Sequence, residues 1–200
     1  YIYNDGENPI YSAFGYLKQQ WVENGSLNAV FPFSEEFQSS RGTVRNCSEQ
    51  WSVGETDTFS TSNGVVTATV QKISANSAIF VEDGTIISST TLNDITLTWE
   101  TTIYPTNSNY FGTAPDVDNN CQIEILIFNI DNAGGIGGYF DPNVASQREI
   151  LFVDASDLSW RNTILAHEFE HLLHNARDPF EYLWIDEGAA DMAAYLCFGV

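Results

Sequence analysis

The chain has 200 residues and a mass of 22.3 kDa, which is enough for one large domain or two small ones with a buried core. Hydrophobic residues make up 43% of the chain and aromatic residues 14%, which excludes wholesale disorder. Seven basic residues against 27 acidic ones give a formal net charge of −20, which repels phosphate backbones and anionic lipid surfaces. We therefore expect no nucleic-acid partner, and no apolar run approaches the ~18 residues of a membrane span.

The first half of the sequence has the composition of β-structure, being rich in Thr, Ser, Val and Gly with turn signals at short spacing. A β-branched run over residues 65–70 and an apolar run over residues 78–81 predict strands that pair as hairpins. Residues 11–21 have a pattern that one helix can form. We therefore predict a β-rich N-terminal module over residues 1–88.

The second half alternates between strand and helix patterns. Residues 92–104 have helical spacing, and Pro105 is expected to end that helix. The remaining predicted elements are strands over 123–130 and 149–153, and helices over roughly 159–176 and 186–198. Strands first and helices last predict an α+β fold with a mixed sheet, whose second part spans residues 89–200.

All three histidines lie within eight residues, and His167 and His171 frame an HExxH motif. On a helix these two lie ~40° apart and one turn along, so both imidazoles can bind one tetrahedral Zn²⁺. Glu168 lies ~100° round the helix from His167, so its carboxylate is expected beside the metal, where a base can take a proton from the metal-bound water. The opposite helix face is apolar, so the histidine face is expected to line a cleft. Two surface histidines one turn apart are the alternative interpretation.

A third metal ligand is predicted sixteen residues after His171. Glu187 and Asp191 lie one turn apart on a predicted helix, a like-charge pair that costs a few tenths of a kcal/mol unless a cation offsets it. A zinc ion bound to Glu187, together with an imidazole N–H that donates a hydrogen bond to Asp191, would offset the repulsion between the two carboxylates. The alternative is an exposed acidic helix start with Asp186 as the N-cap.

The third histidine, His174, is not predicted to be a ligand of the same ion. It shares the histidine face but lies ~10.5 Å along the helix axis from His167. A contact with the ligands, a place in the cleft wall, and plain exposure to solvent all remain open for it. The metzincin pattern is excluded, since His174 stands at its glycine position and Arg177 at its third histidine.

An HExxH motif with a downstream Glu-x-x-x-Asp resembles the gluzincin metallopeptidases, the thermolysin-like clan. Residues 51–191 resemble more closely the hyicolysin-type neutral zinc metallopeptidases and their secreted bacterial relatives. The resemblance covers about two thirds of the chain, and its zinc motif is specific. The matching segments are Val53 and Gly54, Thr58 and Phe59, residues 65–81, Ile103 to Pro105, Phe111 and Gly112, Gly138 to Phe140, and residues 150–154, 166–171 and 184–191.

The resemblance implies His167, His171 and Glu187 as zinc ligands, Glu168 as the catalytic base, and Asp191 as the group that orients His167. It implies a zincin-like catalytic subdomain over residues 89–200, and a secreted or cell-surface zinc endopeptidase that acts on proteins or peptides. The alternative is a non-catalytic surface or adhesive module that keeps a zincin fold.

The sequence departs from the gluzincin pattern at two points. Glu170 places a charge at an HExxH position that is usually uncharged in the family. The C-terminal subdomain, which in gluzincins holds the oxyanion-stabilising group, is missing. We therefore expect the chain to be a truncated piece of a longer protein with further C-terminal domains.

A candidate calcium site lies in the acidic stretch with Asp116, Asp118 and Asn120, whose spacing is that of the start of a calcium loop. An EF-hand is excluded, because position six is Cys121 rather than Gly and position twelve is Ile127 rather than Glu. A looser calcium site and an ordinary polar turn both remain open.

The three cysteines form no CxxC pair, so a cysteine-built zinc site is not expected. One disulfide with one free thiol is typical of an exported protein, and three thiols of a cytosolic one. We predict a Cys47–Cys121 disulfide, because both residues flank strand-like segments, and a buried Cys197 thiol within an apolar helix. The other two pairings remain open.

The glycine-rich segment over residues 134–138 has no phosphate-loop lysine and does not predict a nucleotide site. It lies about 30 residues before the zinc motif. A flexible loop is one interpretation. The other is the edge strand that pairs with substrate backbone in zincins.

Overall fold

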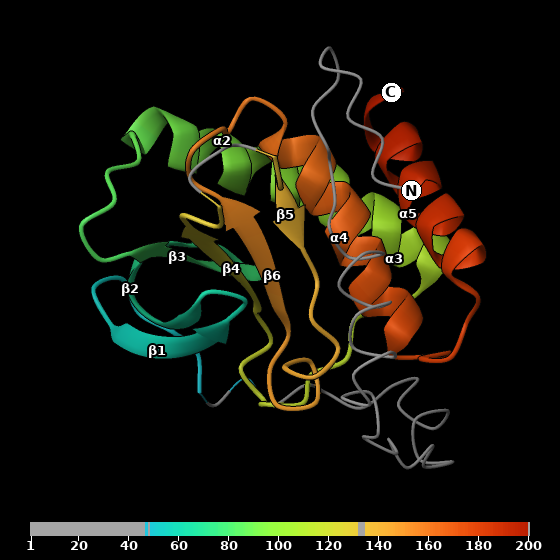
Figure 1. The fold of residues 1–200 in the computed structure, drawn as a ribbon, viewed down its shortest axis with the longest axis horizontal. Helices are drawn as coiled ribbons and strands as arrows, with labels where there is room; N and C mark the ends of the chain where they lie inside the picture. Colours follow the sequence, from blue (N-terminus) through green and yellow to red (C-terminus); the bar gives the residue numbers. More distant parts are fainter. Residues whose placement is uncertain (1–46, 48, 132–134, 200) are drawn as a thin grey trace.

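The computed structural model describes residue 47 and residues 49–131 and 135–199. Within them, the strands form one curled mixed sheet in the order β1-β2-β3-β4-β6-β5, with helices packed on one side (Figure 1). The predicted α+β class with a mixed sheet is therefore confirmed, while the helix predicted over residues 11–21 lies outside the described residues. The elements are β1 (Thr56–Thr61), β2 (Gly64–Ile73), β3 (Ser77–Glu82), α2 (Ser89–Thr98), the π-helical turn η2 (Trp99–Ile103), α3 (Tyr104–Phe111), β4 (Ile123–Phe128), β5 (Gly138–Tyr139), β6 (Ile150–Asp154), α4 (Arg161–Asn175) and α5 (Leu183–Phe198).

Strands β1 to β3 form the two predicted hairpins, with antiparallel pairing throughout. The sequences of β1 and β2 alternate, because one face of this hairpin packs on the core and the other meets solvent. In β2, Val66, Ala68 and Val70 are buried, while Val65 and Thr67 between them are exposed.

Strands β3, β4 and β6 run parallel to one another and are buried on both faces. Their apolar runs are continuous because the helices cover one face and the curled β1–β2 hairpin covers the other. The helix-side core contains Ile79, Val81, Ile125, Ile127, Leu151 and Val153 with Leu92, Ile95, Trp99, Leu165 and Phe169. The hairpin-side core contains Phe80, Leu126, Phe128 and Phe152 with Phe59, Val66, Ala68, Val70 and Tyr139.

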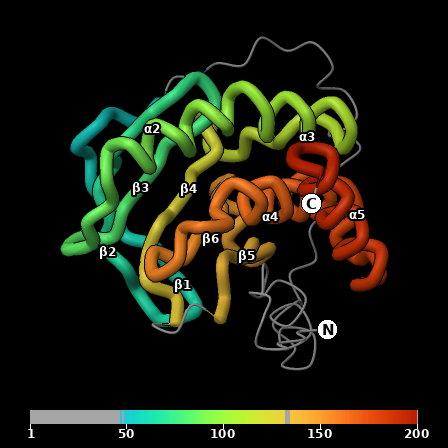
Figure 2. Tube along the Cα trace, turned by 90° about the horizontal axis from the view of Figure 1, so that it is seen from above, coloured from blue at the N-terminus to red at the C-terminus, as the bar shows by residue number. Residues whose placement is uncertain are grey.

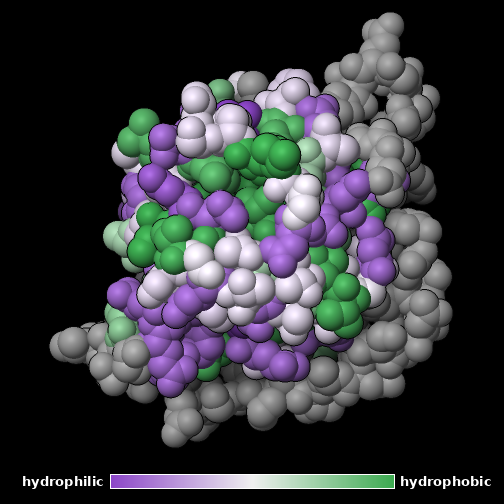
Figure 3. Space-filling model, turned by 90° about the vertical axis from the view of Figure 1, so that its left-hand side faces the viewer, coloured by the Kyte–Doolittle hydropathy of each residue, from purple (hydrophilic) through white to green (hydrophobic). Residues whose placement is uncertain are grey.

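The sheet is continuous across residue 88, since β3 pairs with β4. The division into residues 1–88 and 89–200 stays a prediction. Figure 3 shows the side of the molecule at the left of Figure 1, where hydrophobic patches are separated by hydrophilic residues. Among the described helices, none has the length and apolar character needed to cross a bilayer.

The helix predicted over residues 92–104 does not end at Pro105, so that expectation is wrong. Ser88 caps α2 by accepting a hydrogen bond from Thr91 N, and the helical path then passes through η2 into α3. Pro105 stands in the first turn of α3. A proline costs little there, because its missing N–H has no partner in a first turn.

Helix α4 lies between the β5–β6 edge of the sheet and α5 (Figure 2). Every residue from Ile164 to Leu173 is buried, because the sheet, α3 and α5 all pack against this helix. Helix α5 begins at Leu183, three residues before the predicted start, so Asp186 lies inside its first turn and is not the N-cap. This shift decides which carboxylates face the histidines of α4.

Candidate metal centre

Helix α4 brings His167 and His171 together on the face that meets α5. The apolar face of the helix, with Leu165 and Phe169, packs into the helix-side core and fixes its rotation. The two Nε2 atoms lie 3.2 Å apart, and both imidazoles are buried, with 4% and 0% of their surface exposed. The predicted convergence of the two imidazoles is therefore present.

Helix α5 adds Glu187 to the same point. Glu187 Oε2 lies 3.4 Å from His167 Nε2, and Glu187 Oε1 lies 3.9 Å from His171 Nε2. In a tetrahedral zinc site with bonds of about 2.0–2.1 Å, neighbouring ligand atoms lie about 3.3 Å apart. The donor atoms are thus spaced as the ligands of one ion, and two histidines with one glutamate are a donor set of catalytic zinc sites.

A carboxylate contacts the second ring nitrogen of each histidine. Asp191 Oδ1 lies 3.1 Å from His167 Nδ1, and Asp186 Oδ1 lies 3.2 Å from His171 Nδ1. A carboxylate that accepts the Nδ1 proton fixes the tautomer in which Nε2 carries the free lone pair. Both imidazoles therefore present Nε2 toward Glu187.

The charges around the histidines favour a cation at this point. Burial opposes protonation of His167, but hydrogen bonds to Asp191 and Glu187 and the charge of Glu168 outweigh it and raise the pKa of His167 to about 10. Burial lowers the pKa of His171. Burial also acts to raise the pKa of Glu187, yet its hydrogen bond with His167 holds that pKa below its ordinary value. The donor atoms therefore sit in a field that suits a divalent ion.

Glu168 lies on α4 beside the histidines, fully buried, on the side of the helix that faces strand β5. The backbone of β5 comes close because residue 138 is glycine. A Cβ there would lie 2.5 Å from Ile164 Cγ2, 2.6 Å from Phe152 O and 3.7 Å from Glu168 Cγ. Residues 138 and 139 pair antiparallel with β6 as the outer strand of the described sheet, while pairing of this strand with substrate backbone stays a prediction.

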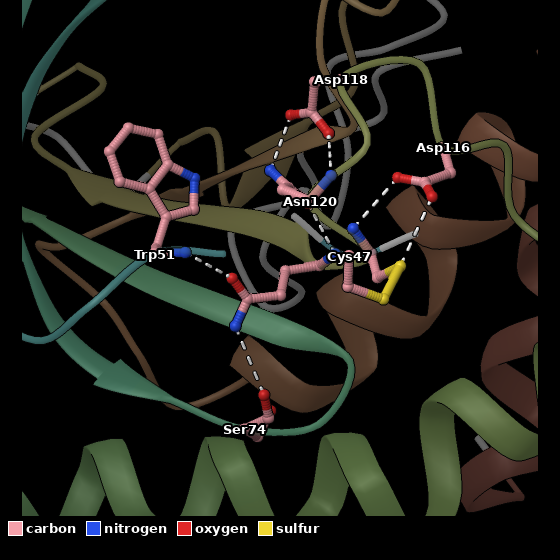
Figure 4. Close-up of a disulfide and its surroundings, with 8 residues drawn as sticks. Cys47, Trp51, Ser74, Asp116, Asp118 and Asn120 are labelled. Carbon is pink, nitrogen blue, oxygen red and sulfur yellow. Dashed lines mark hydrogen bonds between the residues drawn. A yellow bond between two sulfur atoms is a disulfide. The ribbon is translucent and has the colours of Figure 1, made fainter. Parts of the chain in front are cut away.

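The acidic turn before β4 brings two of the predicted calcium ligands together with a third carboxylate. Asp116 and Asp118 lie near Glu149, which precedes β6, and the three carboxylates are close enough to hold one ion. Asn120 also belongs to this turn, since its Nδ2 donates to Asp118 Oδ2 and its Oδ1 accepts from Gln122 N (Figure 4), and its part in a calcium site stays a prediction. Burial, with the charge of Asp118 and Asp116, raises the pKa of Glu149 to about 7.

The predicted Cys47–Cys121 disulfide is present beside this turn (Figure 4). Asp116 also holds the turn, because its Oδ1 accepts a hydrogen bond from Cys121 N at 3.0 Å. Cys197 is a free thiol that is partly rather than fully buried, and its Sγ lies 3.5 Å from Asn107 Oδ1.

Sequence reasoning missed two partners of these sites. The role of Asp186 was hidden by the late predicted start of α5, and an earlier start at Leu183 would have turned its side chain toward α4. Glu149 lies about 30 residues from the acidic turn in sequence, and no local pattern links them. His174 lies one turn beyond His171 and contacts Glu170 and Asp186.

The chain matches no known protein-family model, and no curated protein matches it. The gluzincin interpretation therefore depends on the residues and geometry of the chain itself.

Proposed function

We propose that the chain is a secreted zinc-dependent endopeptidase of the gluzincin type, with a zincin-like subdomain over residues 89–200. The ligands are His167, His171 and Glu187, and Glu168 is the catalytic base. One observation carries the proposal, namely that two helices bring these three donors together at tetrahedral ligand spacing beside a buried glutamate. When bound, zinc would supply a Lewis acid that lowers the pKa of water and polarises a carbonyl.

The chain's own residues then have distinct tasks. Glu168 takes a proton from the attacking water and returns it to the leaving amine, which is general base and then general acid work. Asp191 and Asp186 hold the two imidazoles in the tautomer that binds metal through Nε2. Burial of both histidines keeps their orientation fixed.

The edge strand β5 supports a peptide as the substrate class. Within the described residues β5 is the outer strand of the sheet, so that edge can pair with an extended backbone by adding a strand, and Gly138 leaves room for the backbone there to lie close to Ile164 and Glu168. The net charge of −20 favours neutral or basic peptides over acidic ones.

The Cys47–Cys121 disulfide supports a secreted or cell-surface location, because such bonds persist in oxidising compartments. A calcium ion is the second cofactor of the proposal. Carboxylate oxygens are its preferred ligands, and Glu149 adds a third carboxylate to the predicted Asp116 and Asp118.

The test is cleavage of a denatured protein by the zinc-loaded chain, compared with Glu168→Gln and with Glu181→Gln, a control at a half-buried glutamate outside the three candidate metal-binding groups. Loss of the base should lower kcat/KM by about 10²–10⁴-fold while zinc stays bound, since Glu168 is not a ligand. The control should cleave like the wild type. Cleavage retained in Glu168→Gln would refute the mechanism, and no cleavage by a zinc-loaded wild type would favour the non-catalytic surface module.

A further inference from the structure

We propose that the chain has a second metal site, formed by Glu170 and His174 of α4 and Asp186 of α5, which takes a divalent ion of the zinc class. This site is separate from the ligands of the proposed function. His174 Nδ1 lies 3.4 Å from Glu170 Oε1 and 3.7 Å from Asp186 Oδ1. One ligand atom from each of the three residues lies within 4.8 Å of the other two.

The spacing of these atoms is that of a tetrahedral site. Ligand atoms about 3.3 Å apart are expected for bonds of about 2.0–2.1 Å, and the two distances to His174 differ from that value by only a few tenths of an ångström. The first site shows the same range, from 3.2 Å between the two Nε2 atoms to 3.9 Å between His171 and Glu187. The two distances to His174 therefore fall within the range of the first site.

The donor types select the ion. One imidazole nitrogen with two carboxylate oxygens suits Zn²⁺ and neighbouring transition metals, whereas Ca²⁺ and Mg²⁺ prefer oxygen ligands alone. The side chain of His174 keeps 15% of its surface exposed, so an ion and a water molecule as the fourth ligand can approach from the His174 side.

Burial adds a reason for positive charge at this place. The side chains of Glu170 and Asp186 are only 2% and 4% exposed. Two carboxylates this deeply buried next to each other are stabilised by a nearby cation. A divalent ion supplies this charge, and a proton on His174 is the competing way to supply it.

Asp186 joins the two sites. Its Oδ1 lies 3.2 Å from His171 Nδ1 and 3.7 Å from His174 Nδ1, so the same oxygen faces a ligand of each ion. Filling the second site should weaken the hydrogen bond to His171 and alter the first site. Asp186→Asn should therefore weaken binding at both sites, whereas His174→Asn should remove the second metal and leave the first site occupied.

The experiment is equilibrium dialysis of the metal-free full chain against Zn²⁺, with metal analysis of the bound fraction. Excess Ca²⁺ is present so that the carboxylates of the acidic turn are not counted. The wild type should bind a first and a second equivalent. His174→Asn and Glu170→Gln should each lose one, Glu187→Ala should lose the other, and the control Glu181→Gln, outside the metal-binding groups, should lose neither.

Circular dichroism verifies that each variant is folded, and Co²⁺ titration of the wild type gives a second measurement that needs no variant. Two successive changes in the visible Co²⁺ absorption are expected, and filling the second site should shift the bands of the first. Two equivalents in His174→Asn, or a single wild-type equivalent that His174→Asn retains, would overturn the proposal. A single wild-type equivalent that His174→Asn loses and Glu187→Ala retains would instead count against the proposed peptidase site.

Discussion

Replacing Asp191 by Asn tests whether this carboxylate supports the metal centre. Asparagine keeps the size and the hydrogen-bonding ability of the side chain but removes its negative charge. Asp191 Oδ1 lies 3.1 Å from His167 Nδ1, on the far side of the ring from the proposed metal. Because the charge of Asp191 helps to hold His167 in place and makes it more basic, its loss should loosen zinc without unfolding the chain.

The size of the effect follows from the exposure of Asp191, whose side chain is 79% exposed. A zinc ion on Nε2 would lie about 6 Å from this carboxylate, so the Coulomb energy between the divalent ion and the carboxylate in a water-like dielectric is about 1.4 kcal/mol, which corresponds to about tenfold in affinity. Contacts of this kind typically change metal affinity by about 10–100-fold. We therefore expect Asp191→Asn to weaken zinc binding by about tenfold, at the low end of that range.

Competition between the protein and a zinc-binding dye measures this affinity. The control is Asp178→Asn, which removes the charge of another exposed aspartate. The carboxylate of Asp178 accepts a hydrogen bond from Phe180 N. That variant should bind zinc like the wild type. Equal zinc affinities for wild type and Asp191→Asn would refute the reasoning, and an equal loss in both variants would assign the effect to net charge rather than to the contact.

Three further predictions concern stability, reactivity and calcium. Arg148→Met leaves the fully buried Glu124 without its ion-pair partner and should cost about 3–5 kcal/mol in urea unfolding, part of which Glu124→Gln should restore; an unchanged midpoint would contradict this. Burial raises the pKa of Cys197 from 9.0 to about 11, so the fraction of thiolate at pH 8 should be about 100-fold lower than for an unperturbed thiol. The rate of alkylation should therefore rise about tenfold per pH unit as the pH approaches 11. A rate at pH 8 equal to that of a free cysteine would show that the thiol is not shielded. Ca²⁺ at about 100 times its Kd should add about 2.7 kcal/mol to the free energy of unfolding of the wild type and so raise its melting temperature, but it should not raise that of Glu149→Gln. Equal shifts in melting temperature for both proteins would remove Glu149 from the site.

The sequence by itself determined the elements whose patterns are local. The runs over residues 65–70 and 78–81 and most of the run over 123–130, which forms a strand up to Phe128, became strands because β-branched and apolar side chains fit a pleated, buried surface. The HExxH motif fell on a helix with both imidazoles on one face because the spacing of four residues is close to one helical turn. The Cys47–Cys121 pairing was also foreseen, since both residues flank strand-like segments.

Local patterns gave the wrong end for one helix. Pro105 normally stops a helix, but the π-helical turn before it allows the path to continue into α3. Packing decides this outcome, because Trp99 and Ile103 of that turn are fully buried in the helix-side core. A propensity is a small free energy, and the burial of two large side chains outweighs it.

Only the tertiary structure decided which carboxylates serve which site. Asp186 faces His171 because α5 begins at Leu183 and packs along α4. Glu149 joins Asp116 because the parallel pairing of β4 with β6 places the residue before β6 next to the acidic turn before β4. Sequence periodicity describes one element at a time, whereas these contacts depend on how separate elements pack, and no local pattern carries that information.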